Sequence, residues 1–326
     1  MNLIIALLIF LVLIVMLLIF TFFSPKLISM MVRKMFEKSP ARRPENYSEI
    51  LKKVKVIKDI KYASRFKNND LDLFMPKENN KKTPTIIWIH GGAFVGGDKN
   101  DCEIFSTVIA SNNYNVININ YERAPEQKYP SPIYQFIEVY EWIVRNSETY
   151  NIDLNKLVLA GDSAGAYIAM QIALLIFNDA YKKKTGINIP VKHRQIKSVL
   201  LYCGPYDVTK ISESENKIFA YMMKQTGWAY FGDKNWNQKF RELDIIENIN
   251  EKIKLPPIFV TDGNTNSFLE HAKKLVNRLI DNNIITESYF LNIEDCITQH
   301  EYQFVLDTEP ARIAMEKTLE FLKKYL

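Results

Sequence analysis

A serine framed by two glycines is the residue in this chain whose setting most clearly suggests chemistry. Residues 161–165 (GDSAG) follow the apolar run 156–160 and begin a segment rich in Ala, Ile and Leu. In a G-x-S-x-G turn between a strand and a helix, the small flanking residues allow a sharp turn that raises the serine hydroxyl at the helix N-terminus. The pattern therefore predicts that Ser163 is a nucleophile.

A glycine-rich loop could supply the second part of such a site. Residues 90–98 (HGGAFVGGD) directly follow the apolar run 85–90. Glycines there let backbone N–H groups face a ligand oxygen, as an acyl-transfer enzyme requires. We expect the amides of Gly91 and Gly92, together with that of Ala164, to form an oxyanion hole. A phosphate-binding loop is the alternative, but the segment lacks both G-K-S/T and G-x-G-x-x-G.

A general base for the serine must come from one of four histidines. His90 belongs to the glycine loop, His193 lies in a polar basic stretch, and His271 begins a predicted helix. His300 lies after the last predicted strand and before the final helix, which fits the chain order of nucleophile, acid and histidine. We therefore assign His300 as the base.

These motifs, in this order, resemble the hormone-sensitive-lipase branch of the α/β-hydrolase fold. The resemblance covers roughly residues 50–326. It implies a serine carboxylesterase or lipase with a mostly parallel sheet and helices on both faces, and with no cofactor and no metal. Ala93 stands where that family usually has a third glycine. The segments that carry the resemblance are residues 90–93 (HGGA), 121–130 (YERAPEQKYP), 161–165 (GDSAG) and 300–304 (HEYQF).

The acid of the triad stays open between several residues. The resemblance places an aspartate after the next-to-last strand, and aligning residues 256–261 with that strand puts Asn266 in its position. Asparagine can orient an imidazole but cannot balance the charge of an imidazolium. Asp262 at the strand end and Glu270 one helical turn beyond Asn266 are the preferred substitutes, followed by Asp207 after the previous strand. Helix capping or turn formation would equally explain each of these carboxylates.

The elements that must position these residues alternate between strand and helix. Such βα units with apolar strands indicate a parallel sheet covered by helices on both faces. Strands are predicted at residues 85–90, 115–120, 156–160, 197–203, 257–261 and 286–291, and helices at 133–145, 164–177, 269–280 and 309–325. The aromatic-rich stretch 206–253 interrupts this rhythm. We expect it to form a cap over the site, with ordinary helical packing as the alternative.

The chain begins with an apolar segment. Residues 3–23 contain one polar side chain, Thr21. At about 1.5 Å per residue, the segment is about 30 Å long, the thickness of a bilayer core. A cleaved signal peptide would need a basic start, a shorter apolar core and a small-x-small cleavage site. The segment has none of these features. We therefore expect an uncleaved anchor at residues 1–25.

Basic residues follow this anchor and none precedes it. By the positive-inside rule, a single-pass anchor would then leave the catalytic domain on the cytoplasmic side of the cell membrane. We expect a basic juxtamembrane linker at residues 26–50, in which residues 27–38 could form an amphipathic helix on the membrane surface. Residues 51–326 are expected to form the hydrolase domain. The basic residues after the anchor are Lys26, Arg33, Lys34, Lys38, Arg42 and Arg43.

Composition limits the remaining function classes. With 47% hydrophobic and 24% charged residues, the 326-residue chain is neither disordered nor fibrous. Three scattered cysteines and a dispersed net charge of +5 argue against a disulfide scaffold, a zinc cluster and a nucleic-acid partner. We expect a membrane-anchored serine ester hydrolase that acts on a small apolar ester. An amidase, formamidase or acyltransferase, or a catalytically weak membrane scaffold, is the alternative.

Overall fold

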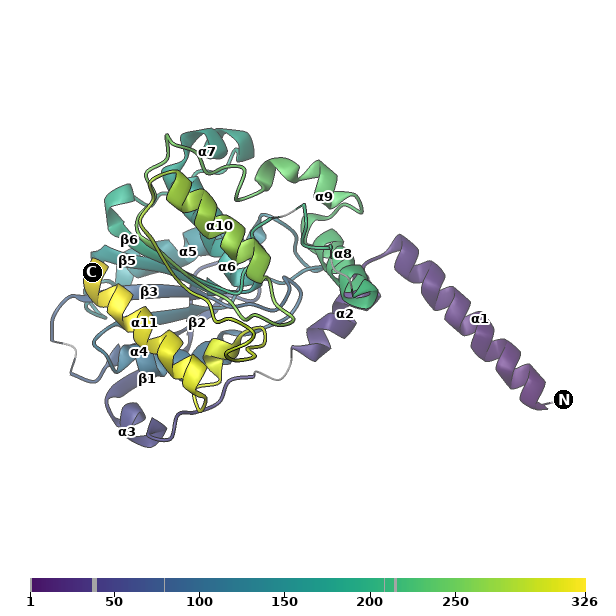
Figure 1. The fold of residues 1–326 in the computed structure, drawn as a ribbon, viewed down its shortest axis with the longest axis horizontal. Coiled ribbons are helices and arrows are strands. Elements are labelled where there is room, and N and C mark those ends of the chain that lie inside the picture. Colours follow the sequence, from purple (N-terminus) through teal and green to yellow (C-terminus); the bar gives the residue numbers. More distant parts are fainter. Residues whose placement is uncertain (1, 37–39, 79, 208, 214–215) are drawn as a thin grey trace.

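A single twisted sheet forms the centre of the protein. The computed structural model describes residues 2–36, 40–78, 80–207, 209–213 and 216–326. Within these residues, eight strands form one sheet in the order β1-β2-β4-β3-β5-β6-β7-β8. The sheet lies between layers of helices (Figure 1). The strands are β1 (Val54–Lys61), β2 (Asp70–Pro76), β3 (Thr83–Ile89), β4 (Asn115–Ile119), β5 (Ile152–Asp162), β6 (Ile196–Tyr202), β7 (Ile258–Thr261) and β8 (Thr286–Tyr289).

The strands from β4 to β8 are parallel, while β1 and β2 are antiparallel to their neighbours. This confirms the α/β-hydrolase fold with a mostly parallel sheet. The sequence analysis predicted the parallel strands but missed β1 and β2. Half of β1 is exposed at the sheet edge, so its apolar pattern is weaker than that of a central strand.

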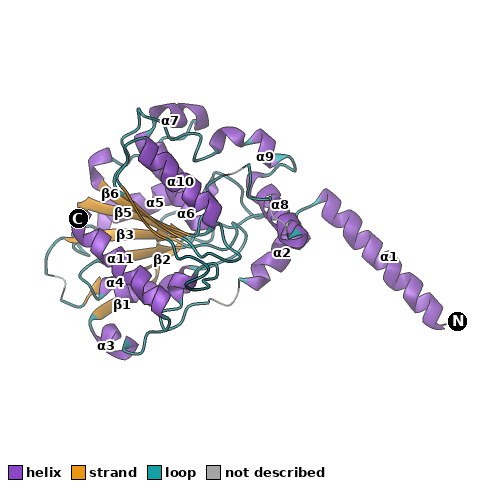
Figure 2. Cartoon of the chain, viewed as in Figure 1, coloured by secondary structure: helices purple, strands orange, loops and turns teal. Residues whose placement is uncertain are grey.

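Helices cover both faces of the sheet (Figure 2). Alternate side chains of β3 point to opposite faces, so that Trp88 packs toward α4 and α11 while Ile87 packs toward α5, α6 and α10. Both faces are therefore buried, which explains the continuous apolar strands. The helices on these faces are α4 (Glu103–Ala110) and α11 (Glu309–Tyr325) on one side, and α5 (Ser131–Asn146), α6 (Ala164–Phe177) and α10 (Leu269–Asp281) on the other. Two shorter helices are α3 (Tyr47–Lys52) and α7 (Asp179–Thr185).

The stretch expected to form a cap folds as helices between β6 and β7. They are α8 (Lys217–Phe231), α9 (Trp236–Lys239) and the 3-10 helix η3 (Arg241–Leu243). The Asn216 side chain accepts hydrogen bonds from two backbone amides in the first turn of α8, and Gly232 ends the helix at φ 77°. The rings of Phe231 and Trp236 stack with centroids 5.3 Å apart, which ties α8 to α9.

The N-terminal apolar segment is the helix α1 (Asn2–Phe23), which projects away from the rest of the protein (Figure 1). Within the described part of the chain, it is the one helix long and apolar enough to cross a membrane. A signal sequence would share this length and composition.

The segment expected to be a basic linker, with an amphipathic helix allowed at residues 27–38, contains the helix α2 (Lys26–Met35), and α2 packs against α8. Ser29 and Val32 are buried in this contact. The Arg33 guanidinium donates to the carbonyl oxygens of Val95 and Ala124 and also forms an ion pair with Glu126. Since these partners lie more than sixty residues further along the chain, local sequence did not reveal that α2 belongs to the folded domain.

Candidate active site

Ser163 lies at the turn between β5 and α6, at the carboxyl ends of the parallel strands. Its backbone has φ 49° and ψ −120°, an unfavourable conformation for a residue with a side chain. The turn requires glycine on both sides, because a Cβ at Gly165 would overlap the carbonyl oxygen of Ile89 and a Cβ at Gly161 would overlap the Gly165 backbone. The geometry presents the serine hydroxyl in the way that the motif predicted.

His300 lies beside this hydroxyl, as the chain order predicted. Its Nε2 is 3.1 Å from Ser163 Oγ. The ring is largely enclosed, with 22% of the side chain exposed, and burial lowers the pKa of His300 to about 4. The imidazole is therefore neutral near pH 7, so its ring can accept a proton.

The other ring nitrogen of His300 contacts a serine rather than a carboxylate. Nδ1 lies 2.8 Å from Ser267 Oγ, and the Ser267 hydroxyl donates to Asp262 Oδ1. Because the Ser267 O–H donates a hydrogen bond to Asp262, the Ser267 oxygen accepts a hydrogen bond from His300 Nδ1–H. The chain of hydrogen bonds thus places the proton on Nδ1 and leaves the Nε2 lone pair facing Ser163.

Of the four acid candidates, Asp262 is the one brought close to His300. Burial raises the pKa of Asp262 to about 7, and the hydrogen bond from Ser267 opposes this increase. Glu270 is 83% exposed and pairs with Lys273, so the expectation for Glu270 is wrong. The two remaining candidates also have other partners: the Asp207 carboxylate pairs with Lys274 at 2.6 Å, and the Asn266 side chain donates to Gln299 Oε1 at 3.1 Å.

The glycine loop forms the expected turn, but one of the three amides assigned to the oxyanion hole is occupied. The Gly91 N–H donates to Asp162 Oδ2 at 2.8 Å, so it is not available to an oxyanion. Among the described residues, no protein group accepts from the amides of Gly92, Ala93 and Ala164. Ala93 and Ala164 both line the cavity that contains Ser163. Ala93 therefore replaces Gly91 as a candidate donor.

A pair of buried carboxyl groups supports this loop from behind. Asp162 accepts hydrogen bonds from Trp88 Nε1 at 2.7 Å and from the Gly91 amide. Burial raises the pKa of both Asp162 and Glu301 and, for Glu301, the adjacent Asp162 raises it further. Glu301 therefore stays protonated, and its carboxyl O–H donates a hydrogen bond to Asp162. The pair fixes the glycine loop relative to the turn at Ser163.

An apolar cavity opens beside the serine hydroxyl. Its walls come from α8 and α9, from the residue that follows α2, and from the loops that carry the site. The largest apolar side chains in the lining are Phe36, Phe94, Phe219, Phe231, Phe268, Met223 and Trp236. Such a cavity suits an apolar group next to a polar reacting centre.

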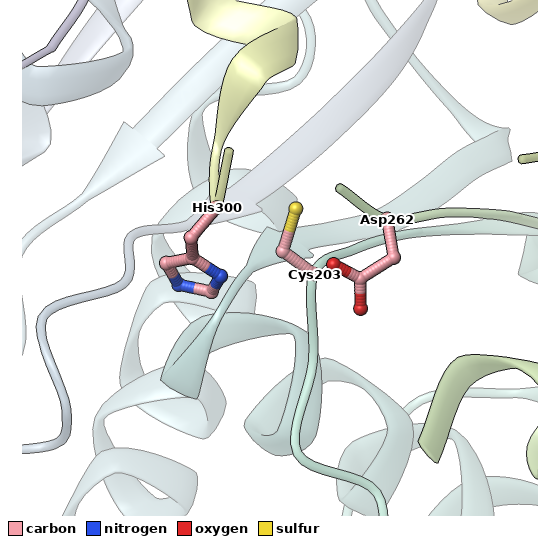
Figure 3. Close-up of side chains that lie close together, drawn as sticks. All are labelled: Cys203, Asp262 and His300. Atoms are coloured by element: carbon pink, nitrogen blue, oxygen red, sulfur yellow. The ribbon is translucent and has the colours of Figure 1, made fainter. Parts of the chain in front are cut away.

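Three possible metal ligands also meet here. One side-chain donor atom from each of Cys203, Asp262 and His300 lies within 4.8 Å of the others, and Figure 3 shows the three side chains together. Burial raises the pKa of the Cys203 thiol well above its usual value, which makes the thiolate that a metal requires unfavourable. The Ser267 hydroxyl already forms hydrogen bonds with both Asp262 and His300. These contacts favour a hydrogen-bonded network over a metal site.

The sequence profile of the BD-FAE family matches residues 71–279, more than half of the chain. The chain belongs to the BD-FAE family. The earlier resemblance to the hormone-sensitive-lipase branch of α/β-hydrolases is confirmed as well.

This BD-FAE family member is similar to a putative alpha/beta hydrolase of Acanthamoeba polyphaga mimivirus. The two sequences are 25% identical over 226 residues, which cover 68% of this chain and 63% of that protein. A versiconal hemiacetal acetate esterase of Dothistroma septosporum is 34% identical over 101 residues, 31% of each chain. The chain thus spans less than two thirds of the length of these relatives. The crystal structure of esterase B from Lactobacillus Rhamnosis has the same fold, with a TM-score of 0.71, 19% identity, and coverage of 87% of this chain and 88% of that one.

Sequence reasoning missed two features of this BD-FAE family site. Ser267 was not considered, although it directly follows Asn266, the position that the family alignment marked. The carboxyl pair of Asp162 and Glu301 was also missed, although these acidic residues directly adjoin Ser163 and His300. The signal was an acidic residue beside each catalytic candidate, and its meaning depended on the two segments meeting in space.

Proposed function

We propose that the protein is a serine ester hydrolase that works through an acyl-enzyme on Ser163 and that α1 anchors it to the membrane. The distance of 3.1 Å between Ser163 Oγ and His300 Nε2 carries the proposal. The apolar cavity and the unpaired amides beside this pair support ester chemistry. Several relatives are named as esterases, such as the versiconal hemiacetal acetate esterase.

In the acylation step, Ser163 Oγ attacks the ester carbonyl while His300 Nε2 takes its proton. The resulting imidazolium keeps its Nδ1–H bonded to Ser267, and Asp262 balances the charge through that hydroxyl. The amides of Ala164, Ala93 and Gly92 stabilise the oxyanion. Collapse of the tetrahedral intermediate breaks the ester C–O bond, and the leaving alcohol takes the proton from Nε2.

Deacylation repeats these steps with water as the nucleophile. His300 Nε2 takes a proton from water, hydroxide adds to the acyl carbon, and Ser163 leaves with the proton returned by His300. The carboxylic acid and the free enzyme result. Asp262 supplies the negative charge that Asn266 cannot provide, and this favours an enzyme over a catalytically weak scaffold.

The test of this proposal uses the full chain in detergent or vesicles. We expect Ser163 to be labelled by a fluorophosphonate probe, and Ser163→Ala to lose both labelling and hydrolysis of a soluble acetate ester. Ser111→Ala, at the end of α4, is the matched control and should keep both. Labelling that persists in Ser163→Ala, or unchanged ester turnover, would reject Ser163 as the nucleophile. Amide substrates in the same assay distinguish an amidase.

A second experiment tests the membrane location. The basic residues that follow α1 support a single pass with the catalytic domain on the cytoplasmic side. We expect a reporter fused to the C-terminus to be active inside the cell and the chain to stay with the membrane fraction after a carbonate wash. A reporter that is active only outside the cell would contradict this orientation.

A further inference from the structure

The helices α2 and α8 expose an unusual number of large apolar side chains. The two helices pack side by side near the end of α1 (Figure 1). Their exposed apolar side chains, with the exposed fraction of each, are Met30 (53%), Met31 (57%) and Met35 (66%) on α2, and Ile218 (75%) and Tyr221 (42%) on α8. We call these five side chains the α2–α8 face. Clustered exposure of this kind marks an interaction surface.

The same two helices also carry exposed lysines. Lys26 and Lys34 on α2 and Lys217 and Lys224 on α8 are exposed. Exposed apolar and basic side chains on one face are typical of helices that lie at a lipid surface, where the apolar groups enter the headgroup region and the lysines contact anionic lipids.

The end of α1 is attached to this region. Lys234 Nζ donates to the carbonyl oxygen of Phe22 at 3.0 Å and lies 3.2 Å from the centre of its ring. Gln225 in α8 donates to the carbonyl oxygen of Thr21 at 3.5 Å. The apolar helix therefore ends beside α8. A membrane that contains α1 would have its surface next to the α2–α8 face.

The same two helices also border the cavity of the candidate active site. Phe219 in α8 and Phe36 directly after α2 line the cavity that contains Ser163. Phe219 is 36% exposed, so it reaches both the cavity and the outer surface. The cavity and the α2–α8 face therefore share the helix α8.

We propose that the α2–α8 face rests on the surface of the membrane that α1 enters, and that the cavity receives an ester with an apolar chain directly from that lipid leaflet. The inference rests on the proposed function, and it adds a docking surface and a membrane-resident substrate class. The membrane is chosen as the occupant because α1 ends beside these helices and because both helices also expose lysines. A second copy of the chain is the competing occupant.

The first test locates the face relative to lipid. The full chain with Cys296→Ser is reconstituted in phosphatidylcholine vesicles with phosphatidylglycerol, and Met31→Cys or Ile218→Cys is labelled with an environment-sensitive fluorophore. The remaining Cys102 and Cys203 are buried. Ile285→Cys is the control, because Ile285 is exposed at the start of β8, opposite the strand ends that carry the site. We expect doxyl-labelled lipid to quench the labels at 31 and 218 but not at 285.

Equal exposure of all three labels to aqueous iodide would overturn the proposal. Shielding at 31 and 218 that depends on protein density and not on lipid would also overturn it, since a second copy would then cover the face. Neither outcome depends on catalysis, so this test separates the docking surface from the proposed ester hydrolysis.

The second test measures whether docking delivers substrate. Met31→Glu combined with Ile218→Glu should lower turnover of a long-chain ester in vesicles by at least about tenfold, since removing even one such apolar contact weakens docking by about that factor. Hydrolysis of a soluble acetate ester should not change, and Ile285→Glu should leave both rates unchanged. Equal vesicle turnover in the double variant and the parent would overturn substrate delivery. If the parent hydrolyses neither ester, the proposed function fails, and quenching still reports on the surface.

Discussion

The hydroxyl of Ser267 is the sharpest test of the proposed mechanism, because it is the one group between the candidate base and its acid. Ser267→Ala removes the acceptor of His300 Nδ1–H and the donor to Asp262 Oδ1. The side chain that replaces it is smaller and apolar, so the backbone has no reason to move. The substitution therefore isolates the hydrogen-bonded chain.

The size of the effect follows from the charge that His300 carries in the transition state. A hydrogen bond to a charged group contributes about 1.5–3 kcal/mol, so we expect kcat/KM to fall about 10- to 100-fold. A triad Asp→Asn substitution in a serine protease costs about 10⁴-fold. That figure is an upper limit here, since Asp262 acts through a hydroxyl rather than by direct contact.

The pH profile separates this role from a purely structural one. When Asp262 is protonated, it donates to Ser267, Ser267 donates to His300 Nδ1, and the histidine proton moves to Nε2, where it blocks the base. Burial raises the pKa of Asp262 to about 7, so the rate should fall as pH drops through about 7. Ser267→Ala breaks this chain of hydrogen bonds, so the acid limb near pH 7 should disappear.

The assay measures kcat/KM for a soluble acetate ester from about pH 5 to about pH 9, a range that includes the pKa of a free histidine. Circular dichroism checks that each variant is folded. Ser267→Thr keeps the hydroxyl and is expected to retain most of the activity. The reasoning is refuted if Ser267→Ala folds normally and shows the rate and acid limb of the parent. Asp262→Asn should lose at least as much activity as Ser267→Ala, and the double variant should lose less than the product of the two.

Three further predictions concern the surroundings of the site. Glu270→Gln should leave kcat/KM within about twofold in a steady-state assay, because the side chain is exposed. Glu301→Leu should lower the free energy of unfolding in urea by about 2 kcal/mol, since it removes one of the donors to the buried Asp162 carboxylate, whereas Glu301→Gln keeps a donor and should cost less. Arg33→Leu should also lower the free energy of unfolding by about 2 kcal/mol, because it removes the hydrogen bonds and the ion pair that attach α2 to the domain. Faster proteolytic cleavage after residue 36 would show that α2 has been released.

Local pattern was enough to predict much of the fold and the two central side chains. The apolar strands are recognisable as continuous apolar runs because burial on both faces of a parallel sheet requires them. Ser163 was found because a sharp strand-to-helix turn demands glycine at fixed positions, and His300 because the order of elements in this fold places the base after the last strand. The apolar helix α1 was readable from length and composition alone.

Tertiary structure decided which neighbours these residues have. Gly91 looked like an oxyanion donor until the fold placed Asp162 at its amide, and Glu270 looked like an acid until its helix turned it toward solvent. The path from Asp262 through Ser267 to His300 joins two segments more than thirty residues apart. Sequence spacing reports the period of a segment and the strain of a turn, because both arise within a few residues. A hydrogen bond between distant segments depends on how whole elements pack, and no local pattern records it.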